Sequence, residues 1–285
     1  MSENRSDRMK LFNEVSVLCS RVTTLKYSTS FSKSIKALAP DVQDAIFAIY
    51  GFVRLADEIV DSFHGYERVE LFDRIKKDTN KALDEQISIN PILQAFQIAF
   101  HQYGIEREHV DLFLQSMEQD LRPIDFNRTE YDSYITGSAE VVGLMCLKVF
   151  VRGDQEQYEK LAPAAIRLGA AFQKVNFLRD VNEDFQQLGR SYFPGVDLTK
   201  LDDQSKKAIE HEIDEDLRVA YLGLVQLPKD TRFGVYLAYT YYKGLLKRIR
   251  NVPSNSIMRT RIRVPDFQKY ALMAASYSRH RLNLL

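Results

Sequence analysis

Apolar residues recur at intervals of three and four along almost the whole chain, which is the period of α-helices that bury one side. On this pattern we expect ten helices, with two longer loops at 187–202 and 251–264. The pattern contains no series of alternating strands, no internal repeat and no Gly/Ser-rich linker. The sequence therefore predicts a single all-α domain over 1–285. The expected helices span residues 8–26, 40–63, 68–86, 91–102, 107–121, 128–152, 155–186, 203–224, 229–251 and 265–282.

The helix expected at 40–63 is apolar over most of its circumference but carries one narrow polar stripe. Tyr50, Arg54, Asp57 and Asp61 follow one another at spacings of 4, 3 and 4 and so lie on one face. Asp57 and Asp61 are one turn apart, about 6 Å along the helix axis. An ionised carboxylate in such an apolar surrounding is very costly unless it has a partner. The stripe therefore indicates a polar site inside the protein.

A second expected helix, at 155–186, repeats this arrangement. Its polar stripe contains Gly169, Gln173, Asn176, Asp180 and Asp184, and the two aspartates are again four residues apart. A single stripe of this kind is typical of the solvated face of a surface helix. Two narrow stripes in two apolar helices instead favour a shared interior cavity that holds water and metal.

The side chains on the two stripes indicate which metal to expect. Four aspartates without a histidine or cysteine partner supply only hard oxygen ligands, which suits Mg²⁺, with Mn²⁺ as a substitute. Magnesium is usually bound by one or two carboxylates together with substrate phosphates, so we expect a ligand that carries phosphate. The sequence has no glycine loop of the nucleotide-binding type. An apolar helical cavity with metals at one end favours an isoprenoid diphosphate, whose tail fills the cavity.

Two segments around these aspartates resemble the squalene and phytoene synthase family. They read RLADEIVD at 54–61 and QKVNFLRDVNEDFQQLGRSYFP at 173–194, and they look like the family's two aspartate-rich motifs. The resemblance covers about residues 20–275 and implies the isoprenoid synthase fold, a helical bundle around a central cavity. Further likeness lies in YSTSF at 27–31, SMEQDL at 116–121, YITGSAEVVGLM at 134–145, YYKGLLKRI at 241–249 and RTRIRV at 259–264.

The resemblance also implies roles for individual residues. In the family both aspartate pairs hold Mg²⁺ that bridges to the substrate diphosphates, which implies Asp57, Asp61, Asp180 and Asp184 as metal ligands. Arg54 and Tyr134 are implied as further catalytic residues. The residues implied around the diphosphates are Ser28, Ser30, Arg54, Gln173, Asn176, Arg179, Tyr242 and Arg261, with Arg259 and Arg263 competing for the place of Arg261.

The reaction that the resemblance implies is a head-to-head, 1–1′ condensation of two prenyl diphosphates. We expect two geranylgeranyl diphosphates to give phytoene through a cyclopropyl intermediate, prephytoene diphosphate, with release of diphosphate. The alternatives are a squalene or dehydrosqualene synthase that uses farnesyl diphosphate, and a catalytically inactive assembly protein of the same fold. Squalene formation needs NADPH, which we do not expect here. A head-to-tail prenyltransferase or terpene cyclase is disfavoured, because those have DDxxD motifs and both motifs here are DxxxD.

Two positions depart from the family pattern. Asn182 replaces a glycine between the second pair of aspartates, off their stripe, where we expect it to be tolerated. Glu140 replaces a small residue near a break in an active-site helix, and it either points outward or alters the pocket. Glu140 therefore leaves the chain length of the substrate, C15 or C20, open.

Composition and charge limit the partners. The 285 residues include 39 Lys and Arg and 39 Asp and Glu, so the formal net charge is zero and nucleic acid is not an expected partner. Two isolated cysteines, Cys19 and Cys146, are typical of a reducing cytosol. The polar start and the lack of an apolar run of about 18 residues predict a cytoplasmic protein. The sequence leaves its oligomeric state open.

The basic stretch at 243–264 has two interpretations. It is either a solvated helix end and loop, or a surface of which one part faces diphosphate and another contacts anionic lipid. The expected product is a water-insoluble hydrocarbon that must pass to a membrane. We therefore expect peripheral membrane contact for product release.

Overall fold

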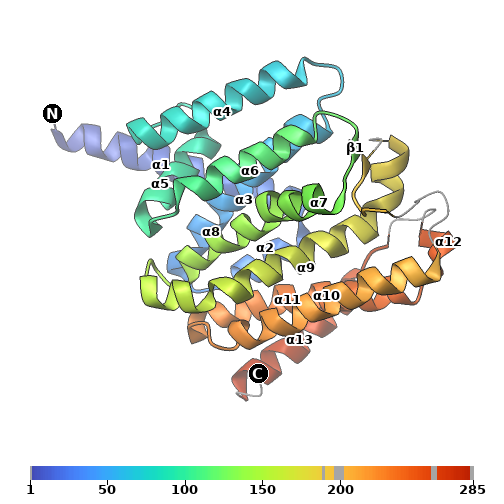
Figure 1. Ribbon diagram of the computed structural model, residues 1–285. Coiled ribbons are helices and arrows are strands. Elements are labelled where there is room, and N and C mark those ends of the chain that lie inside the picture. The colour runs from blue at the N-terminus through green and yellow to red at the C-terminus, as the bar shows by residue number, and fades with distance from the viewer. Residues whose placement is uncertain (1, 188–189, 196–201, 258–261, 283–285) are drawn as a thin grey trace.

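The computed structural model of the protein has an all-α fold, as predicted (Figure 1). The structure describes residues 2–187, 190–195, 202–257 and 262–282. Its helical segments are α1 (Ser2–Tyr27), α2 (Thr29–Lys36), α3 (Pro40–Asp61), α4 (Arg68–Glu85), α5 (Pro91–Tyr103), α6 (Arg107–Gln119), α7 (Arg128–Ile135), η1 (Thr136–Glu140), α8 (Val141–Phe150), α9 (Gln155–Gln187), α10 (Asp203–Leu224), α11 (Lys229–Arg250), α12 (Ser254–Ile257) and α13 (Asp266–Arg281). Two short strands, β1 (Ile124–Asp125) and β2 (Arg190–Ser191), pair in parallel.

Two short helices lie where no helix was predicted. α2 follows α1 after a single non-helical residue, Ser28, whose backbone is extended. The Ser28 hydroxyl accepts a hydrogen bond from the Phe31 amide at 3.1 Å and so caps α2. α12 lies inside the segment predicted as a loop at 251–264. The predicted helix at 8–26 begins earlier, at Ser2.

The helix predicted at 128–152 contains a π-helical segment, η1, between α7 and α8. Close packing around η1 needs glycine at two points. A Cβ on Gly137 would lie 1.8 Å from the Ser116 hydroxyl of α6, and a Cβ on Gly169 of α9 would lie 2.5 Å from the Ala139 carbonyl oxygen. Because neither position has a side chain, the backbone of η1 lies between α6 and α9.

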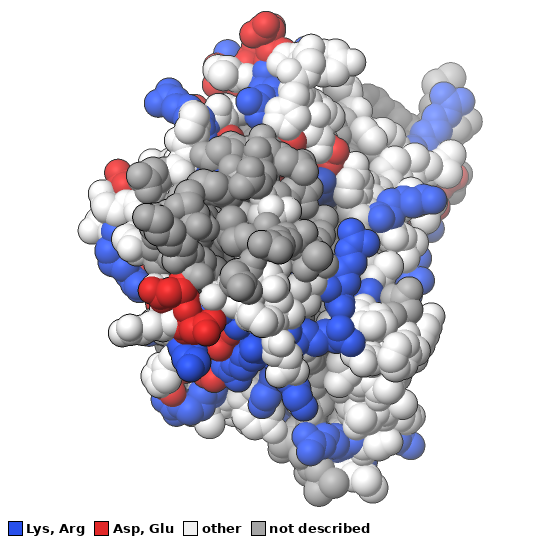
Figure 2. Space-filling model, turned by 90° about the vertical axis from the view of Figure 1, so that its right-hand side faces the viewer, with Lys and Arg blue, Asp and Glu red and all other residues white. Residues whose placement is uncertain are grey.

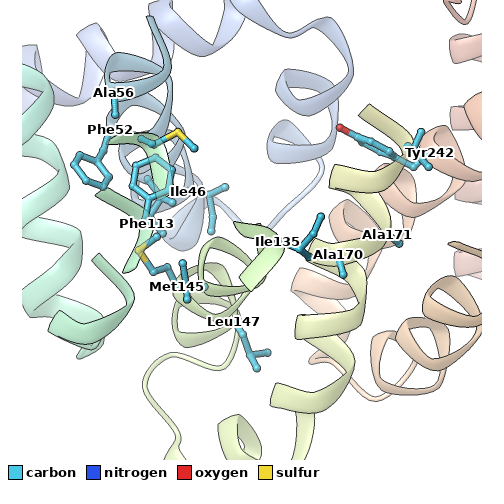
Figure 3. Close-up of a cluster of buried hydrophobic side chains, with 14 of the residues drawn as sticks. Ile46, Phe52, Ala56, Phe113, Ile135, Met145, Leu147, Ala170, Ala171 and Tyr242 are labelled. Atoms are coloured by element: carbon cyan, nitrogen blue, oxygen red, sulfur yellow. The ribbon is translucent and has the colours of Figure 1, made fainter. Parts of the chain in front are cut away.

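The helix α3 is the centre of the bundle and packs against α1, α2, α4, α5, α6 and α8. Its Phe52 ring is stacked on Phe96 at 4.0 Å and tilted against Phe113 at 5.4 Å. Figure 3 shows Phe52 and Phe113 side by side, with Met145 of α8 beside them. The long helix α9 packs in turn against α8, η1, α10 and α11. Both helices with the predicted polar stripes thus contribute to the interior of the bundle.

An apolar cavity of about 280 Å³ lies between these helices. Residues from six α-helices and from η1 line it, among them Ile35, Ile49, Val142, Leu168, Leu224 and Val235. Along α9 the lining begins at Leu161 and ends at Asn176, so the cavity follows this helix for much of its length. The residues beyond Asn176 include the second aspartate motif.

One continuous helical stretch, Arg128–Phe150, is long and apolar enough to cross a membrane by length and composition alone. It corresponds to α7, η1 and α8, and 61% of its most apolar window is buried inside the protein. This burial is typical of a core helix in a bundle.

Candidate active site

The polar stripe of α3 begins at the cavity with Tyr50 and continues beyond it. Tyr50 and Val53 line the cavity, and Arg54 and Asp57 follow them on the helix. The Arg54 guanidinium forms ion pairs with Asp57 and Glu58 and lies 4.2 Å from the centre of the Tyr27 ring. These contacts hold Arg54 beside the carboxylates rather than in open solvent.

Negative charge is crowded around Asp57. Loss of solvation, together with repulsion from Asp61, raises the pKa of Asp57 to about 7, and Arg54 only partly opposes this. Part of the Asp57 side-chain surface, 31%, remains exposed. A carboxylate in this position is stabilised by additional positive charge.

The polar stripe of α9 has the same relation to the cavity. Gln173 and Asn176 line it, and Asp180 follows one turn later. Arg179 donates from Nε to both carboxylate oxygens of Asp180 at 3.0 Å. The structure describes the backbone of Asp184 in α9 but not its side chain.

A group of aromatic side chains connects the two stripes. The Phe31 ring of α2 lies 5.9 Å from Tyr50 of α3, 6.2 Å from Phe172 of α9 and 5.8 Å from Tyr242 of α11. Phe172 and Tyr242 are stacked at 3.8 Å, and the Tyr242 hydroxyl donates to Asn176 Oδ1 at 3.3 Å. Burial raises the pKa of Tyr50 to about 12, with Arg54 opposing the shift. All four rings line the cavity, so they form its wall where the two aspartate motifs begin.

The remaining residues that the resemblance implies lie outside these two polar stripes. The Ser28 side chain caps α2 and is also hydrogen-bonded to the Tyr50 side chain. Ser30 is half-buried in the first turn of α2. Tyr134 is buried, is not among the residues that line the cavity, and donates to Asp120 Oδ2 at 2.8 Å. Arg259 and Arg261 lie outside the described residues, whereas Arg263 is described and exposed.

Sequence reasoning assigned no role to Asp120 and Arg190, although both belong to segments noted for their family likeness. Arg190 is 97% buried. Its Nη1 atom lies 2.7 Å from Asp61 Oδ1 and 3.9 Å from Asp120 Oδ1. Its Nη2 atom donates a hydrogen bond to the backbone carbonyl oxygen of Asp120 at 2.7 Å. The Tyr192 hydroxyl donates to Asp120 Oδ1 at 3.3 Å. Burial raises the pKa of Asp120 to about 7, and Arg190 opposes the shift. Arg190 thus joins the chain after α9 to the C-terminal ends of α3 and α6.

Glu140 is not among the residues that line the cavity, whereas its neighbours Ser138 and Ala139 are. Its carboxylate accepts a hydrogen bond from the Thr136 hydroxyl at 2.8 Å. Burial raises the pKa of Glu140, with Lys174 and Arg167 of α9 opposing the shift. Glu140 therefore faces a charged cluster between η1 and α9 rather than the cavity. Asn182 is half-buried in α9.

Among the described side chains, no three of His, Cys, Asp and Glu lie close enough to hold a metal by themselves. The carboxylates instead form two sets, one on α3 and one on α9, at the same end of the cavity. Each set is paired with an arginine of its own motif, Arg54 or Arg179. Such an arrangement suits an anionic ligand that completes the coordination of metal between the two sets.

An apolar cavity enclosed by helices, with one DxxxD motif following it on each of two helices, is typical of the isoprenoid synthase fold. The same fold occurs in a dehydrosqualene synthase, which superimposes with a TM-score of 0.79 at 19% identity over 93% of this chain and 96% of that one. A squalene synthase, HpnC from Alicyclobacillus acidocaldarius, has a TM-score of 0.72 at 17% identity over 84% of this chain and 94% of that one.

Sequence comparison defines the family more closely. The chain is 26% identical to a 15-cis-phytoene synthase of Synechocystis over 92% of its own length and 84% of that protein. It is 33% identical to a presqualene diphosphate synthase of Zymomonas mobilis, over 61% of its own length and only 58% of that protein. The family pattern for squalene/phytoene synthases matches residues 24–268. The chain belongs to the squalene/phytoene synthase family, whose enzymes join prenyl diphosphates head to head.

We predict that Arg190→Met lowers the free energy of unfolding by about 3–5 kcal/mol, because it leaves the buried Asp120 carboxylate without its cation. Asp120→Asn in the same chain should restore part of the loss. Thermal and denaturant unfolding measure both effects.

The matched control for Arg190→Met is Arg152→Met. Arg152 also pairs with two carboxylates, Asp41 and Asp230, but its side chain is 37% exposed. We expect it to change stability by about 1 kcal/mol or less. Equal effects of the two substitutions would contradict a structural role for the buried pair.

Proposed function

We propose that this protein catalyses the Mg²⁺-dependent head-to-head condensation of two geranylgeranyl diphosphates to phytoene, with release of diphosphate. The observation that carries the proposal is that the polar stripes of α3 and α9 both begin at one apolar cavity, where the Phe31, Tyr50, Phe172 and Tyr242 rings connect the two helices. A prenyl tail fits the cavity, and its diphosphate would lie among the charged residues.

The residues present fit Mg²⁺. Asp57, Asp61 and Asp180 offer hard oxygen ligands, and burial together with repulsion from Asp61 raises the pKa of Asp57, so a cation there would stabilise its charged form. Asp57, Asp61, Asp180 and Asp184 would hold the metal, which would neutralise charge on the diphosphates and on the leaving group. Mn²⁺ is expected to substitute, and NADPH is not expected to be needed.

Arg54 and Arg179 would bind the leaving diphosphate. Each is already paired with an aspartate of its motif, so its guanidinium is held near the site before substrate arrives. When the allylic carbon–oxygen bond breaks, negative charge develops on the diphosphate, and a pre-positioned arginine stabilises that charge. Gln173 and Asn176 lie between the arginines and the cavity and would orient the diphosphate end.

The wall of the cavity protects the carbocation that remains. The faces of Tyr50, Phe172 and Tyr242 carry negative electrostatic potential, which stabilises a nearby cation. The apolar lining beyond them excludes water, which would otherwise capture the cation as an alcohol. The cation is instead attacked by the double bond of the second substrate, and loss of a proton closes the ring of a cyclopropyl diphosphate. Loss of the second diphosphate lets this intermediate rearrange to a linear cation, which loses a second proton to give the product.

The length of the cavity supports a C20 substrate. The lining of α9 extends from Asn176 back to Leu161, a span of 15 residues or about 22 Å. Each isoprene unit contributes four chain bonds of about 1.5 Å, or roughly 5 Å when extended. Four units therefore match the span, whereas three leave its end empty. The similarity to phytoene synthase over nearly the whole chain supports the same substrate class.

A second candidate is a synthase that uses farnesyl diphosphate. The similarity to presqualene diphosphate synthase over part of the chain favours it, with a product that keeps one diphosphate. Incubation with Mg²⁺ and either C15 or C20 prenyl diphosphate, with and without NADPH, separates the candidates by the mass of the product. A C30 product would replace the phytoene assignment, and a lack of any product from folded protein would favour the inactive assembly protein.

We predict that Asp57→Asn and Asp180→Asn each reduce turnover at least a hundredfold, because each removes a metal ligand while preserving side-chain shape. The helical circular dichroism should remain unchanged. Asp73→Asn, at an exposed position on α4, is the matched control and should retain full activity. Removal of Mg²⁺ with EDTA should abolish turnover in the unaltered protein, and re-addition should restore it. Full activity of either motif variant would refute the metal-site assignment.

We predict that Ala165→Phe changes the preferred substrate from C20 to C15. Ala165 lines the cavity 11 residues before Asn176, or about 16 Å along α9, so a ring there shortens the cavity by roughly one isoprene unit. The ratio of C30 to C40 product from mixed substrates measures the change. Ala274→Phe, at an exposed position on α13, is the control and should leave the ratio unchanged. An unchanged ratio in Ala165→Phe would contradict the cavity depth as the determinant.

We also propose that the C-terminal part of the chain contacts a membrane for product release. Residues 243–285 contain ten Lys and Arg but one acidic residue, so the charge balance of the whole chain hides a strongly basic end. In the same part, Phe267, Tyr270 and Tyr277 of α13 are 70%, 57% and 52% exposed. Figure 2, which faces the end of the molecule where α9 ends, shows Lys and Arg in a band along the lower and right-hand surface.

Flotation with vesicles that contain phosphatidylglycerol measures this contact. We predict that the protein floats with the vesicles at low salt, and that Phe267→Ser with Tyr277→Ser releases it, because the aromatic rings anchor the helix at the interface. Tyr66→Ser removes an equally exposed ring, 74% exposed, at a distant loop and should not change flotation. Equal flotation of both variants would argue against α13 as the contact.

A further inference from the structure

The outer face of α1 carries a continuous apolar stripe. Leu11, Val15, Leu18, Val22 and Leu25 are 61%, 44%, 52%, 53% and 39% exposed. They follow one another at spacings of 4, 3, 4 and 3, which is the strict seven-residue repeat of a coiled-coil seam rather than the broader stripe of a helix that covers a core. Figure 1 shows α1 at the edge of the molecule, with its N-terminal end projecting from the bundle.

The inner face of α1 is polar instead. Ser16, Ser20 and Thr24 are completely buried against the bundle. Ser16 and Thr24 donate to carbonyl oxygens of their own helix, at 2.8 and 2.9 Å. These small residues let α1 approach α3 closely: a Cβ on Gly51 would lie 2.7 Å from the Ser20 hydroxyl. The helix thus buries its polar side and exposes its apolar side, the reverse of an ordinary surface helix.

We propose that the apolar stripe of α1 is the dimer interface of this protein, in which the α1 helices of two copies pack antiparallel. A seven-residue repeat is suited to one partner helix, and a closed two-fold contact buries the same stripe on both copies. The charges beside the stripe complement one another in this orientation. Glu14 lies next to the stripe and would face Arg21 of the partner subunit, and the pair occurs twice across the axis.

The same charges disfavour the parallel orientation, which would place Arg21 beside Lys26 of the partner subunit. Arg21 pairs with Asp44 within its own chain at 2.6 Å, but its side chain remains 39% exposed. The flanks of α1 also disfavour a lipid surface as the occupant. Asp7, Glu14 and Lys10 are all exposed there, and this mixture of signs differs from the basic flanks of membrane-bound helices.

Sedimentation velocity over a range of protein concentrations tests the proposal. We expect the protein to sediment as a dimer, and Leu18→Glu with Val22→Glu to make it a monomer with unchanged helical circular dichroism, because both side chains are already half exposed. Val69→Glu, at a 61% exposed apolar position on α4, is the matched control and should remain dimeric. A monomer at every concentration, or a dimer that persists in the α1 variant, would overturn the proposal. A monomer whose vesicle flotation is lost in the same variant would assign the stripe to a membrane instead.

Disulfide trapping tests the orientation in a Cys19→Ser background. Arg8 and Leu25 are exposed and lie 17 residues apart on α1. An antiparallel pair of α1 helices would place Arg8 of one protomer beside Leu25 of the partner subunit. Arg8→Cys with Leu25→Cys should therefore give a covalent dimer on oxidation, whereas Leu25→Cys alone should not. A covalent dimer from Leu25→Cys alone would show a parallel seam and contradict the proposed arrangement.

Discussion

The structure depends on holding several carboxylates at one end of an apolar helical bundle. Asp57, Asp61 and Asp120 lie close enough to repel one another, and burial makes their charges more costly. Arginine side chains offset this charge in two ways. Arg190 is fixed in the interior and joins Asp61 to Asp120, whereas Arg54 and Arg179 lie at the end of the cavity beside carboxylates of their own helices. The first arrangement stabilises the fold, and the second leaves cations at the place where an anionic ligand would arrive.

The apolar cavity next to these carboxylates is formed by the apolar surfaces of the helices that surround it. α3 is apolar around most of its circumference and lies in the core, and α9 packs its apolar side against α8, η1, α10 and α11, so both helices contribute to one interior surface. The aromatic rings at this point separate two environments over one helical turn. On one side lie Arg54 and Asp57, and on the other lies a cavity without charged lining residues. Chemistry that creates a cation from an anionic ester needs both environments in contact.

Local periodicity explains why the two stripes were predictable from the sequence. The spacing of Tyr50, Arg54 and Asp57 determines their common face once the segment is helical, and the number of apolar neighbours indicates burial. Asp120 and Arg190 were not assigned, because 70 residues separate them and no periodic pattern connects a residue at a helix end with one in a short strand. The side of η1 that Glu140 faces depends on Lys174 and Arg167, which are equally remote in sequence. Ser28 ends α1 and starts α2 through one side-chain hydrogen bond, which apolar periodicity does not record.

The π-helical segment η1 determines which residues of one long helix face which environment. Tyr134 lies before it and contacts Asp120, and Val142 lies after it and lines the cavity. One residue in an α-helix corresponds to a rotation of about 100°. Loss of a single residue from η1 would let an ordinary α-helix form and would turn α8 by this angle relative to α7. The cavity would then present a different set of side chains, although none of them had been substituted. In this part of the fold the length of the chain carries as much information as the identity of its residues.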